Sequence, residues 1–212
     1  MIIMDISEYI SEKAAVFVQA SLDKSNIEME QIKYGIQSIL TNTFKMIILF
    51  ITAYFLGVAK YTLIALVTFG ILRSLASGIH ATSSLKCIIA NYIIFLGNVY
   101  LSIHFTLDKL NITVLFFISL VLIALYAPAD TAARPLTSKK TRKKLKTLSI
   151  VTTISLYILA ITLKNNTYVN IVTFSACIEA ILITPLAYKV FNLPYRNYKK
   201  YETKASTSNQ SK

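Results

Sequence analysis

The stretch Ile112-Thr-Val-Leu-Phe-Phe-Ile-Ser-Leu-Val-Leu-Ile-Ala-Leu-Tyr-Ala-Pro128 decides the fold of this chain. It holds no charged side chain, and it is close to the ~20 apolar residues with which a helix spans a bilayer. The segment that follows is strongly basic, with Arg134, Lys139, Lys140, Arg142, Lys143, Lys144 and Lys146. Lysine and arginine gather on the cytoplasmic side of membrane proteins. The stretch is therefore predicted to be a transmembrane helix that ends at the cytoplasmic face.

The composition of the whole chain also indicates a membrane protein. Of its 212 residues, 55% are hydrophobic and 15% are charged, and the mean hydropathy is +0.57. A soluble domain normally carries about 25% charged residues. The net charge of +12 would suggest a nucleic-acid partner in a soluble protein. In so apolar a chain we expect no nucleic acid, and we attribute the charge to the positive-inside bias and to a bilayer with anionic lipids.

Six apolar stretches, each near the length of a bilayer, predict an all-α polytopic membrane protein. They cover residues 38–58, 61–79, 85–104, 112–128, 148–164 and 168–188. Before them, residues 1–35 have apolar side chains at helical spacing, which indicates an amphipathic helix on the membrane or over the bundle, or else an ordinary surface helix. Residues 1–200 are expected to form one membrane-embedded domain, and residues 201–212 a disordered polar tail.

The basic residues predict the orientation of the six stretches. The end of the chain adds Lys189, Arg196, Lys199, Lys200, Lys204 and Lys212 to the basic segment, whereas the opposite connections hold Lys60, Asp108 with Lys109, and Lys164. Six spans with both termini in the cytoplasm satisfy this pattern. The connection over residues 73–87 then also lies at the cytoplasmic face.

That connection reads Arg73-Ser-Leu-Ala-Ser-Gly-Ile-His-Ala-Thr-Ser-Ser-Leu-Lys-Cys87. His80 and Cys87 supply an imidazole and a thiol, the minimum equipment for cysteine nucleophilic catalysis. On one continuous helix they would lie about 10 Å apart along the axis, which is too far for a hydrogen bond of about 3 Å. The chain between them must turn if they act together, and Gly78 and Thr82-Ser83-Ser84 supply turn and cap chemistry.

This turn would place Cys87 in the first turn of the third helix. The helix dipole and the neighbouring Lys86 would there favour the thiolate form. A single cysteine in a membrane helix is also often a small apolar filler, so residue types alone leave a structural role open. His104 and Cys177 are expected to have no catalytic role.

Two ionisable residues inside apolar stretches are further candidates, because such residues are usually functional. Arg73 would brace the site, stabilise an oxyanion, or extend to the inner membrane interface. Glu179 would pair with Arg73, orient His80, or face a polar seam. Gln37, which precedes the first span, could orient the imidazole through its amide oxygen, since a third residue usually fixes the histidine tautomer. The sequence does not choose between Gln37 and Glu179.

The pattern Arg73-x4-Gly78-x-His80-x6-Cys87 resembles the AgrB family of membrane-embedded cysteine endopeptidases of bacterial peptide quorum sensing. Two further segments are similar to that family: Tyr34-Gly-Ile-Gln37, and Tyr126-Ala-Pro-Ala-Asp-Thr-Ala-Ala-Arg-Pro-Leu136. The resemblance runs from about residue 5 to residue 200. The family often has glutamate where this chain has Gln37, which puts a charged partner for the imidazole in doubt.

The resemblance implies a bacterial cell-membrane enzyme that acts on a precursor peptide of the AgrD type. His80 and Cys87 would be catalytic, and Cys87 would form a thioester that a cysteine or serine of the precursor resolves to a cyclic thiolactone or lactone. Arg73, Gly78, Gln37 and Glu179 would support them. The acidic C-terminal part of the precursor would contact Arg134, Lys139, Lys140, Arg142 and Lys143, with anionic lipid as the alternative partner of these residues. A homodimer would agree with the family.

Two other functions remain open. The chain could be a small peptide transporter or exporter in which Arg73 and Glu179 line the pathway, or a scaffold whose basic segment docks a soluble partner. Loss of function on Cys87→Ala would separate the enzyme from both. No cofactor is expected, and His80 with Cys87 provides too few ligands for a metal such as zinc.

Overall fold

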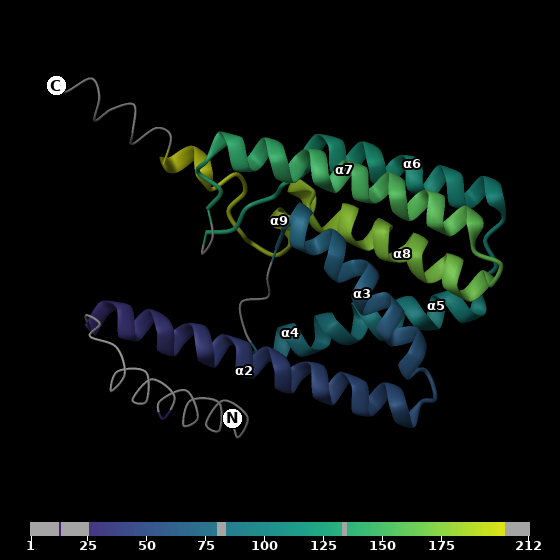
Figure 1. Ribbon diagram of the computed structural model, residues 1–212, viewed down its shortest axis with the longest axis horizontal. Coiled ribbons are helices and arrows are strands. Elements are labelled where there is room, and N and C mark those ends of the chain that lie inside the picture. Colours follow the sequence, from purple (N-terminus) through teal and green to yellow (C-terminus); the bar gives the residue numbers. More distant parts are fainter. Residues whose placement is uncertain (1–12, 14–25, 80–83, 133–134, 202–212) are drawn as a thin grey trace. The chain divides into compact units, whose positions relative to one another are not determined.

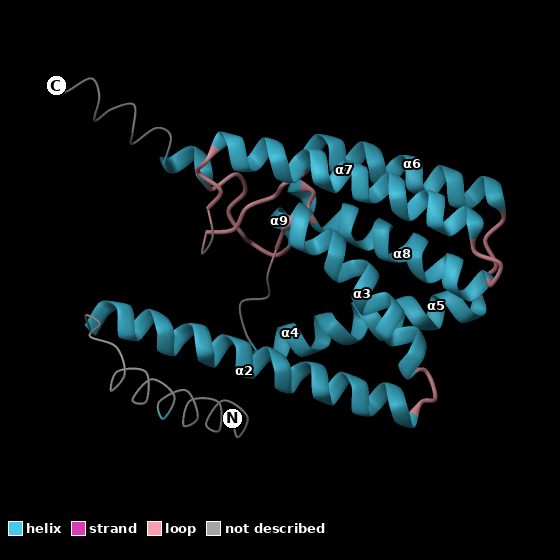
Figure 2. Ribbon diagram, viewed as in Figure 1, coloured by secondary structure: helices cyan, strands magenta, loops and turns pink. Residues whose placement is uncertain are grey.

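The structure is a computed structural model that describes residues 13, 26–79, 84–132 and 135–201. Every regular element in this part of the chain is a helix (Figure 2), which confirms the predicted all-α class. The chain forms two compact units, Met1–Gly57 and Val58–Lys212, and each is described by itself. The predicted amphipathic helix over residues 1–35 and the predicted tail over residues 201–212 lie almost wholly outside the described residues.

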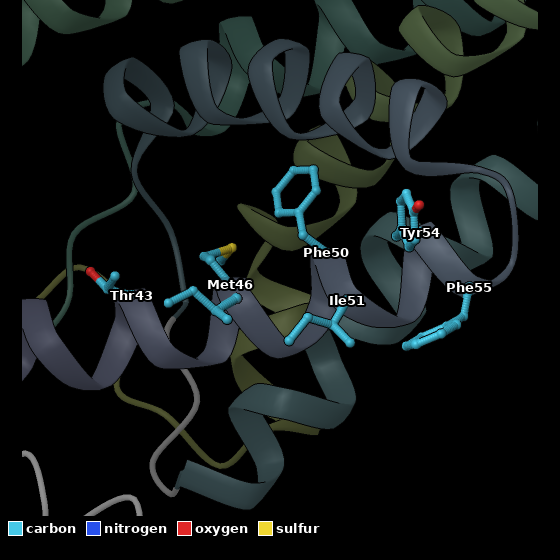
Figure 3. Close-up of a pocket in the computed structure, with 7 residues that line it drawn as sticks. Thr43, Met46, Phe50, Ile51, Tyr54 and Phe55 are labelled. Carbon is cyan, nitrogen blue, oxygen red and sulfur yellow. The ribbon is translucent and has the colours of Figure 1, made fainter.

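The first unit contributes the long helix α2, Asn26–Phe55. Its second half, Ile39–Phe55, is apolar and corresponds to the first predicted span. A shallow pocket on this half is lined by Thr43, Met46, Ile47, Phe50, Ile51, Tyr54 and Phe55, and Phe50 and Tyr54 project from the same side of the helix (Figure 3). The helix therefore presents a broad apolar surface, as a helix in lipid does.

The second unit contains the remaining helices, and Figure 1 labels its α-helices, from α3 to α9. They are α3 (Ala59–Ala76), α4 (Ser84–Asn91), the π-helix η1 (Tyr92–Gly97), α5 (Asn98–His104), α6 (Lys109–Tyr126), α7 (Lys139–Thr162), α8 (Asn166–Leu182) and α9 (Pro185–Val190). Because α4, η1 and α5 follow one another without a break, they form a single helical run. That run corresponds to the third predicted span.

Four helices are long and apolar enough to cross a membrane: α3, the run Leu85–His104, α6 and α7. Two further apolar helices, Ile39–Phe55 and α8, are shorter. The protein is therefore a helical membrane protein with four candidate spans among its described residues, and each of the six predicted stretches coincides with an apolar helix. Whether all six cross the bilayer stays a prediction.

Helix α8 is the centre of the second unit, since α3, α5, α6 and α7 all pack on it. Its buried face carries Val169, Val172, Ala176 and Ala180, which join the core built from α3, α6 and α7. Apolar side chains surround this bundle on its outside, where Phe117 of α6 is 65% exposed. A bundle with an apolar exterior is the arrangement that lipid requires.

Polar side chains join α5 to the start and the middle of α8. Asn98 donates to the hydroxyl of Ser175 (2.9 Å), and Ser102 donates to the amide oxygen of Asn98 (3.0 Å). Asn170 donates to the carbonyl oxygens of Ser102 (3.1 Å) and Phe105 (2.6 Å). Neutral hydrogen bonds of this kind hold helices together inside membranes.

The basic segment that follows α6 is helical over much of its length, although we expected a connection extending to residue 147. Helix α7 begins at Lys139, because the side chain of Ser138 caps it by accepting a hydrogen bond from the backbone N–H of Thr141 (3.3 Å). Lys139, Lys140, Arg142, Lys143 and Lys146 therefore project from the first two turns of a helix.

Helix α8 ends at Leu182, earlier than the predicted end of the sixth stretch at residue 188. Pro185 explains this difference, because proline has no N–H to continue a helix but fits the first turn of a new one. The side chain of Thr184 caps that new helix, α9, by accepting from the N–H of Ala187 (3.3 Å). The chain then returns past the end of α6.

Candidate functional site

The site begins where α3 ends, at the turn Ser77-Gly78-Ile79. Ser77 has a φ of 60° and Gly78 a φ of 122°, and both values lie in a region that glycine adopts easily and other residues avoid. The helix is therefore broken abruptly before residue 80. This confirms the predicted turn at Gly78.

Arg73 holds this turn with its guanidinium group. Its Nη1 donates to the carbonyl oxygen of Ser77 (2.9 Å), and its Nη2 donates to the carbonyl oxygen of Ile79. These carbonyls cannot find partners within α3, because the helix has already ended. We call this arrangement the arginine clasp, made of Arg73 and the backbone of Ser77–Ile79.

Gly78 is required by the clasp itself. A Cβ atom at this position would collide with the Arg73 guanidinium and would lie 3.2 Å from the Cγ2 atom of Ile183. The guanidinium is the mobile end of the Arg73 side chain, so an alanine here would push it out of the clasp, and the positive φ of Gly78 would strain the alanine backbone. The Arg73-x4-Gly78 spacing is thus explained by the space that the guanidinium occupies.

Glu179 of α8 completes the clasp. Its side chain is fully buried, and its Oε2 lies 3.4 Å from Nη1 of Arg73, whose side chain is 17% exposed. This pairing is one of the three roles predicted for Glu179. Its other oxygen, Oε1, has no hydrogen-bond partner among the residues that the structure describes. A buried carboxylate in this state is costly unless something else near it donates a hydrogen bond.

A second segment, Ala127–Asp130, is bonded to the base of the clasp. The N–H of Ala129 donates to the carbonyl oxygen of Ala76 (2.8 Å), and Ser77 and Ala129 form an isolated parallel bridge. The peptide bond between Ala127 and Pro128 is cis. The end of α6 and the end of α3 are thereby fixed to each other.

Asp130 connects this segment to the end of the chain. It is buried, and its carboxylate accepts hydrogen bonds from the backbone N–H groups of Asn197 (2.9 Å) and Tyr198 (2.7 Å). Its carbonyl oxygen accepts from the hydroxyl of Tyr188 (2.8 Å) in α9. A carboxylate with several N–H donors makes strong, charge-assisted bonds, so residues 185–198 are held against the base of the site.

The sequence did not predict these roles of Asp130, Tyr188 and Asn197. Asp130 lies 67 residues from Asn197, and local patterns carry no information about such pairs. The available signal was weak: an acidic residue directly after an apolar stretch, in a chain with few acidic residues.

Cys87 is the fourth residue of α4, which begins at Ser84. This confirms that the thiol lies in the first turn of the third helical run. The residue is half-buried and forms no disulfide. His80 lies in residues 80–83, outside the described part, so the thiol–imidazole pair stays a prediction. Gln37 lies on α2, in the other unit, and its predicted contact with the imidazole also remains untested.

The predicted basic residues that the structure describes differ in their surroundings. The Nη1 atom of Arg142 donates to the carbonyl oxygens of Leu136 (2.6 Å) and Thr137 (3.0 Å), and its guanidinium lies 4.0 Å from the ring centroid of Tyr198. Lys139, Lys140 and Lys143 are exposed. Arg134 lies outside the described residues. Arg142 therefore supports the backbone before α7, while the exposed lysines are available to a ligand.

The remaining thiol and imidazole have ordinary partners. Cys177 accepts a hydrogen bond from the hydroxyl of Ser119 (3.4 Å), and Nδ1 of His104 lies 2.8 Å from the carbonyl oxygen of Tyr100. Within residues 26–79, 84–132 and 135–201, no three His, Cys, Asp or Glu side chains are gathered as metal ligands.

The comparisons with known proteins identify the family of the chain. A model of the accessory gene regulator B (AgrB) family matches residues 6–183. The chain is 32% identical over 197 residues to an AgrB-like protein of Clostridium acetobutylicum, covering 93% of this chain and 94% of that one. It is 29% identical over 175 residues to the accessory gene regulator protein B of Staphylococcus aureus, and 31% identical over 175 residues to that of Staphylococcus lugdunensis. Each of these two alignments covers 82% of this chain and 92% of the relative. No solved structure matches.

Proposed function

The chain belongs to the AgrB family, whose members process AgrD pro-peptides in peptide quorum sensing, and we propose that it does so as a cysteine endopeptidase with Cys87 as nucleophile and His80 as general base. The observation that carries the proposal is the arginine clasp. Arg73 holds the carbonyl oxygens of Ser77 and Ile79, and Ile79 is the residue directly before His80. A turn fixed in this way supports a functional side chain on the next residue.

The chemistry proceeds in two acyl transfers. The Cys87 sulfur attacks the scissile carbonyl carbon of the precursor, and His80 takes the thiol proton and returns it to the leaving amine. The amide C–N bond breaks and a thioester to Cys87 forms. A cysteine or serine side chain of the precursor then attacks the thioester, which gives a cyclic thiolactone or lactone and returns the proton to Cys87.

The location of the site suits this sequence of steps. Thioester formation from an amide is energetically uphill, so water must be kept from the intermediate. Exchange of a thioester for a thiolactone is nearly isoenergetic and depends mainly on proximity. A site at the cytoplasmic boundary of the membrane would hold an amphipathic precursor beside Cys87.

Arg73 acts in this scheme as a positioning residue, because its donors are used by backbone carbonyls and by Glu179. Glu179 is the stronger candidate for orienting His80, since its Oε1 is buried without a partner among the described residues, and its Oε2 bonds to the same Arg73 guanidinium that holds the carbonyl oxygen of Ile79. The exposed Lys139 and Lys140 are candidates for contact with the acidic part of the precursor. A transporter pathway is less well supported, since Arg73 and Glu179 face each other instead of an open channel.

The experiment uses the purified protein in lipid vesicles with the precursor peptide encoded beside its gene. Intact-mass spectrometry follows cleavage by the wild type, Cys87→Ala and His80→Ala. We expect a wild-type adduct equal to the precursor without its C-terminal fragment, and no cleavage by either variant although both insert into vesicles. Unchanged processing by Cys87→Ala would sink the proposal and favour transport.

A further inference from the structure

A pocket of about 320 Å³ lies beside the site, on the far side of the Ala127–Asp130 segment. Its walls come from the end of α6 together with the Ala127–Asp130 segment, from the first turns of α7, and from the chain segment after α9, which Figure 1 shows in yellow beside the start of α7. We call it the basic pocket. Its cationic side chains are Arg142, Lys143, Lys146 and Arg196.

The charge of the basic pocket is strongly unbalanced. Among the described residues, its lining holds four cationic side chains and a single carboxylate, that of Asp130. The Asp130 oxygens already face the backbone N–H groups of Asn197, Tyr198 and Leu136 (2.9, 2.7 and 3.4 Å). The Asp130 carboxylate is therefore hydrogen-bonded to the backbone that forms the pocket wall. Four cations around one cavity repel one another, and an anion bound between them would relieve that repulsion.

An apolar strip leads directly to the basic pocket. Phe117, Val121 and Leu125 recur at four-residue spacing on one face of α6 and are 65%, 40% and 59% exposed. Leu125 also lines the pocket. Since α6 is a candidate span that ends at Tyr126, the strip lies in the hydrocarbon and the pocket at the membrane boundary. An apolar strip that ends in a cationic pocket matches the shape of an amphiphile.

The size of the pocket distinguishes between a lipid headgroup and an acidic peptide as the bound anion. About 320 Å³ is near the lower limit for a small-molecule site. It holds one headgroup, whereas an acidic peptide several residues long needs an extended groove. Tyr126, Tyr195 and Tyr198 in the lining are residues typical of the membrane–water interface. A phospholipid, with its phosphate group in the pocket and its acyl chains along α6, matches the size, the charge and the apolar strip.

We propose that the basic pocket binds the phosphate-bearing headgroup of an anionic phospholipid, whose acyl chain lies on the Phe117–Leu125 strip. This site is separate from Cys87. It adjoins the arginine clasp, because Ala129 of the shared wall donates to Ala76. A lipid bound there would stiffen the segment on which the clasp rests.

The test measures binding to the purified wild-type protein in a neutral detergent. The probes are short-chain phosphatidylglycerol, short-chain phosphatidylcholine, inorganic phosphate and oligoglutamate, with stabilisation against thermal unfolding as the readout. We expect concentration-dependent stabilisation by phosphatidylglycerol and at least tenfold weaker effects of the other three. Equal binding of inorganic phosphate would assign a free-anion site instead, and stronger binding of oligoglutamate would assign an acidic-peptide site.

Matched variants locate the site. Lys143→Gln with Lys146→Gln removes two charges that line the pocket, and Lys139→Gln with Lys140→Gln removes two exposed charges from the same helix that do not line it. At about 1 kcal/mol per lysine, the first pair should weaken phosphatidylglycerol binding about 30-fold. The second pair should change it less than about threefold.

Arg196→Gln, on the opposite wall of the pocket, gives an independent measurement and should weaken binding about fivefold. Unfolding without lipid serves as the folding control for every variant. Equal losses from the two lysine pairs would overturn the proposal, since they would show general attraction to a basic surface. The measurement needs no precursor, so its failure is distinguishable from failure of the proposed function.

Discussion

Helix α8 carries buried polar side chains near both of its ends, and the two ends differ in kind. Asn170 near its start and Ser175 at its middle make neutral hydrogen bonds to α5. Near its end, Glu179 pairs with Arg73, which in turn holds backbone carbonyls of a turn. The first end joins one regular helix to another. The second end uses a charged pair to hold irregular backbone.

The energetic scale of the two ends differs accordingly. A neutral hydrogen bond between membrane helices contributes about 0.6 kcal/mol on average, whereas removing one partner of a buried ion pair costs about 3–5 kcal/mol. Regular helices do not require the larger interaction. We conclude that the neutral hydrogen bonds of α8 stabilise the helix packing, whereas Glu179 near its end stabilises the turn before His80.

The largest effect is expected from Gly78→Ala. The new Cβ would displace the Arg73 guanidinium and strain the backbone at positive φ, and a displacement of about 1 Å can lower a rate about 100-fold. The cleavage rate in vesicles measures this loss. Gly70→Ala is the control, because a Cβ at Gly70 meets nothing within 4 Å. A normal cleavage rate for Gly78→Ala would show that catalysis does not depend on the arginine clasp.

Arg73→Lys should lower the cleavage rate about 30-fold. A lysine keeps the charge beside Glu179, but its single ammonium cannot reproduce the fork that reaches Ser77, Ile79 and Glu179 together. Hydrogen bonds to charged groups contribute about 1.5–3 kcal/mol each. Arg73→Ala should be worse, since it leaves Glu179 unpaired. Equal rates for the lysine and alanine variants would show that charge pairing contributes nothing.

Asp130→Asn should release the end of the chain from the base of the site. An amide has one acceptor oxygen where the carboxylate has two, so one of the N–H groups of Asn197 and Tyr198 loses its partner. Trypsin cleavage after Arg196 should become about tenfold faster. Asp108→Asn at the other end of α6 is the control, because asparagine also caps helices. Unchanged proteolysis would mean that Asp130 does not hold this segment.

The smallest effect is expected from Asn98→Ala. It removes the hydrogen bonds to Ser175 and Ser102, and it should lower the free energy of unfolding by about 1 kcal/mol. The cleavage rate per folded molecule should stay the same. A thermal unfolding curve and a rate corrected for the folded fraction test both points. A falling rate at full folding would contradict the division between the two ends of α8.

The interactions near the end of α8 could be predicted from the sequence better than those nearer its start. An arginine and a glutamate inside apolar stretches are conspicuous, so their pairing could be anticipated, and so could the turn at Gly78. The neutral network of Asn98, Ser102 and Asn170 could not, since such residues are common in membrane helices. Asp130 was missed because its partners are distant in the chain. Ser138 is a favourable N-cap residue for α7, but we predicted a connection over the run of lysines that follows it.

The measurement that tests this account most directly is the single-turnover rate of Cys87 acylation in Glu179→Gln and Asn98→Ala, side by side in vesicles. Intact mass reports the thioester, Cys87→Ala gives the background, and each rate is divided by the folded fraction. We predict that Glu179→Gln acylates at least tenfold more slowly than the wild type, because Gln cannot neutralise Arg73, and that Asn98→Ala acylates at the wild-type rate. A wild-type rate for Glu179→Gln, or an equal slowing of both variants, would contradict it.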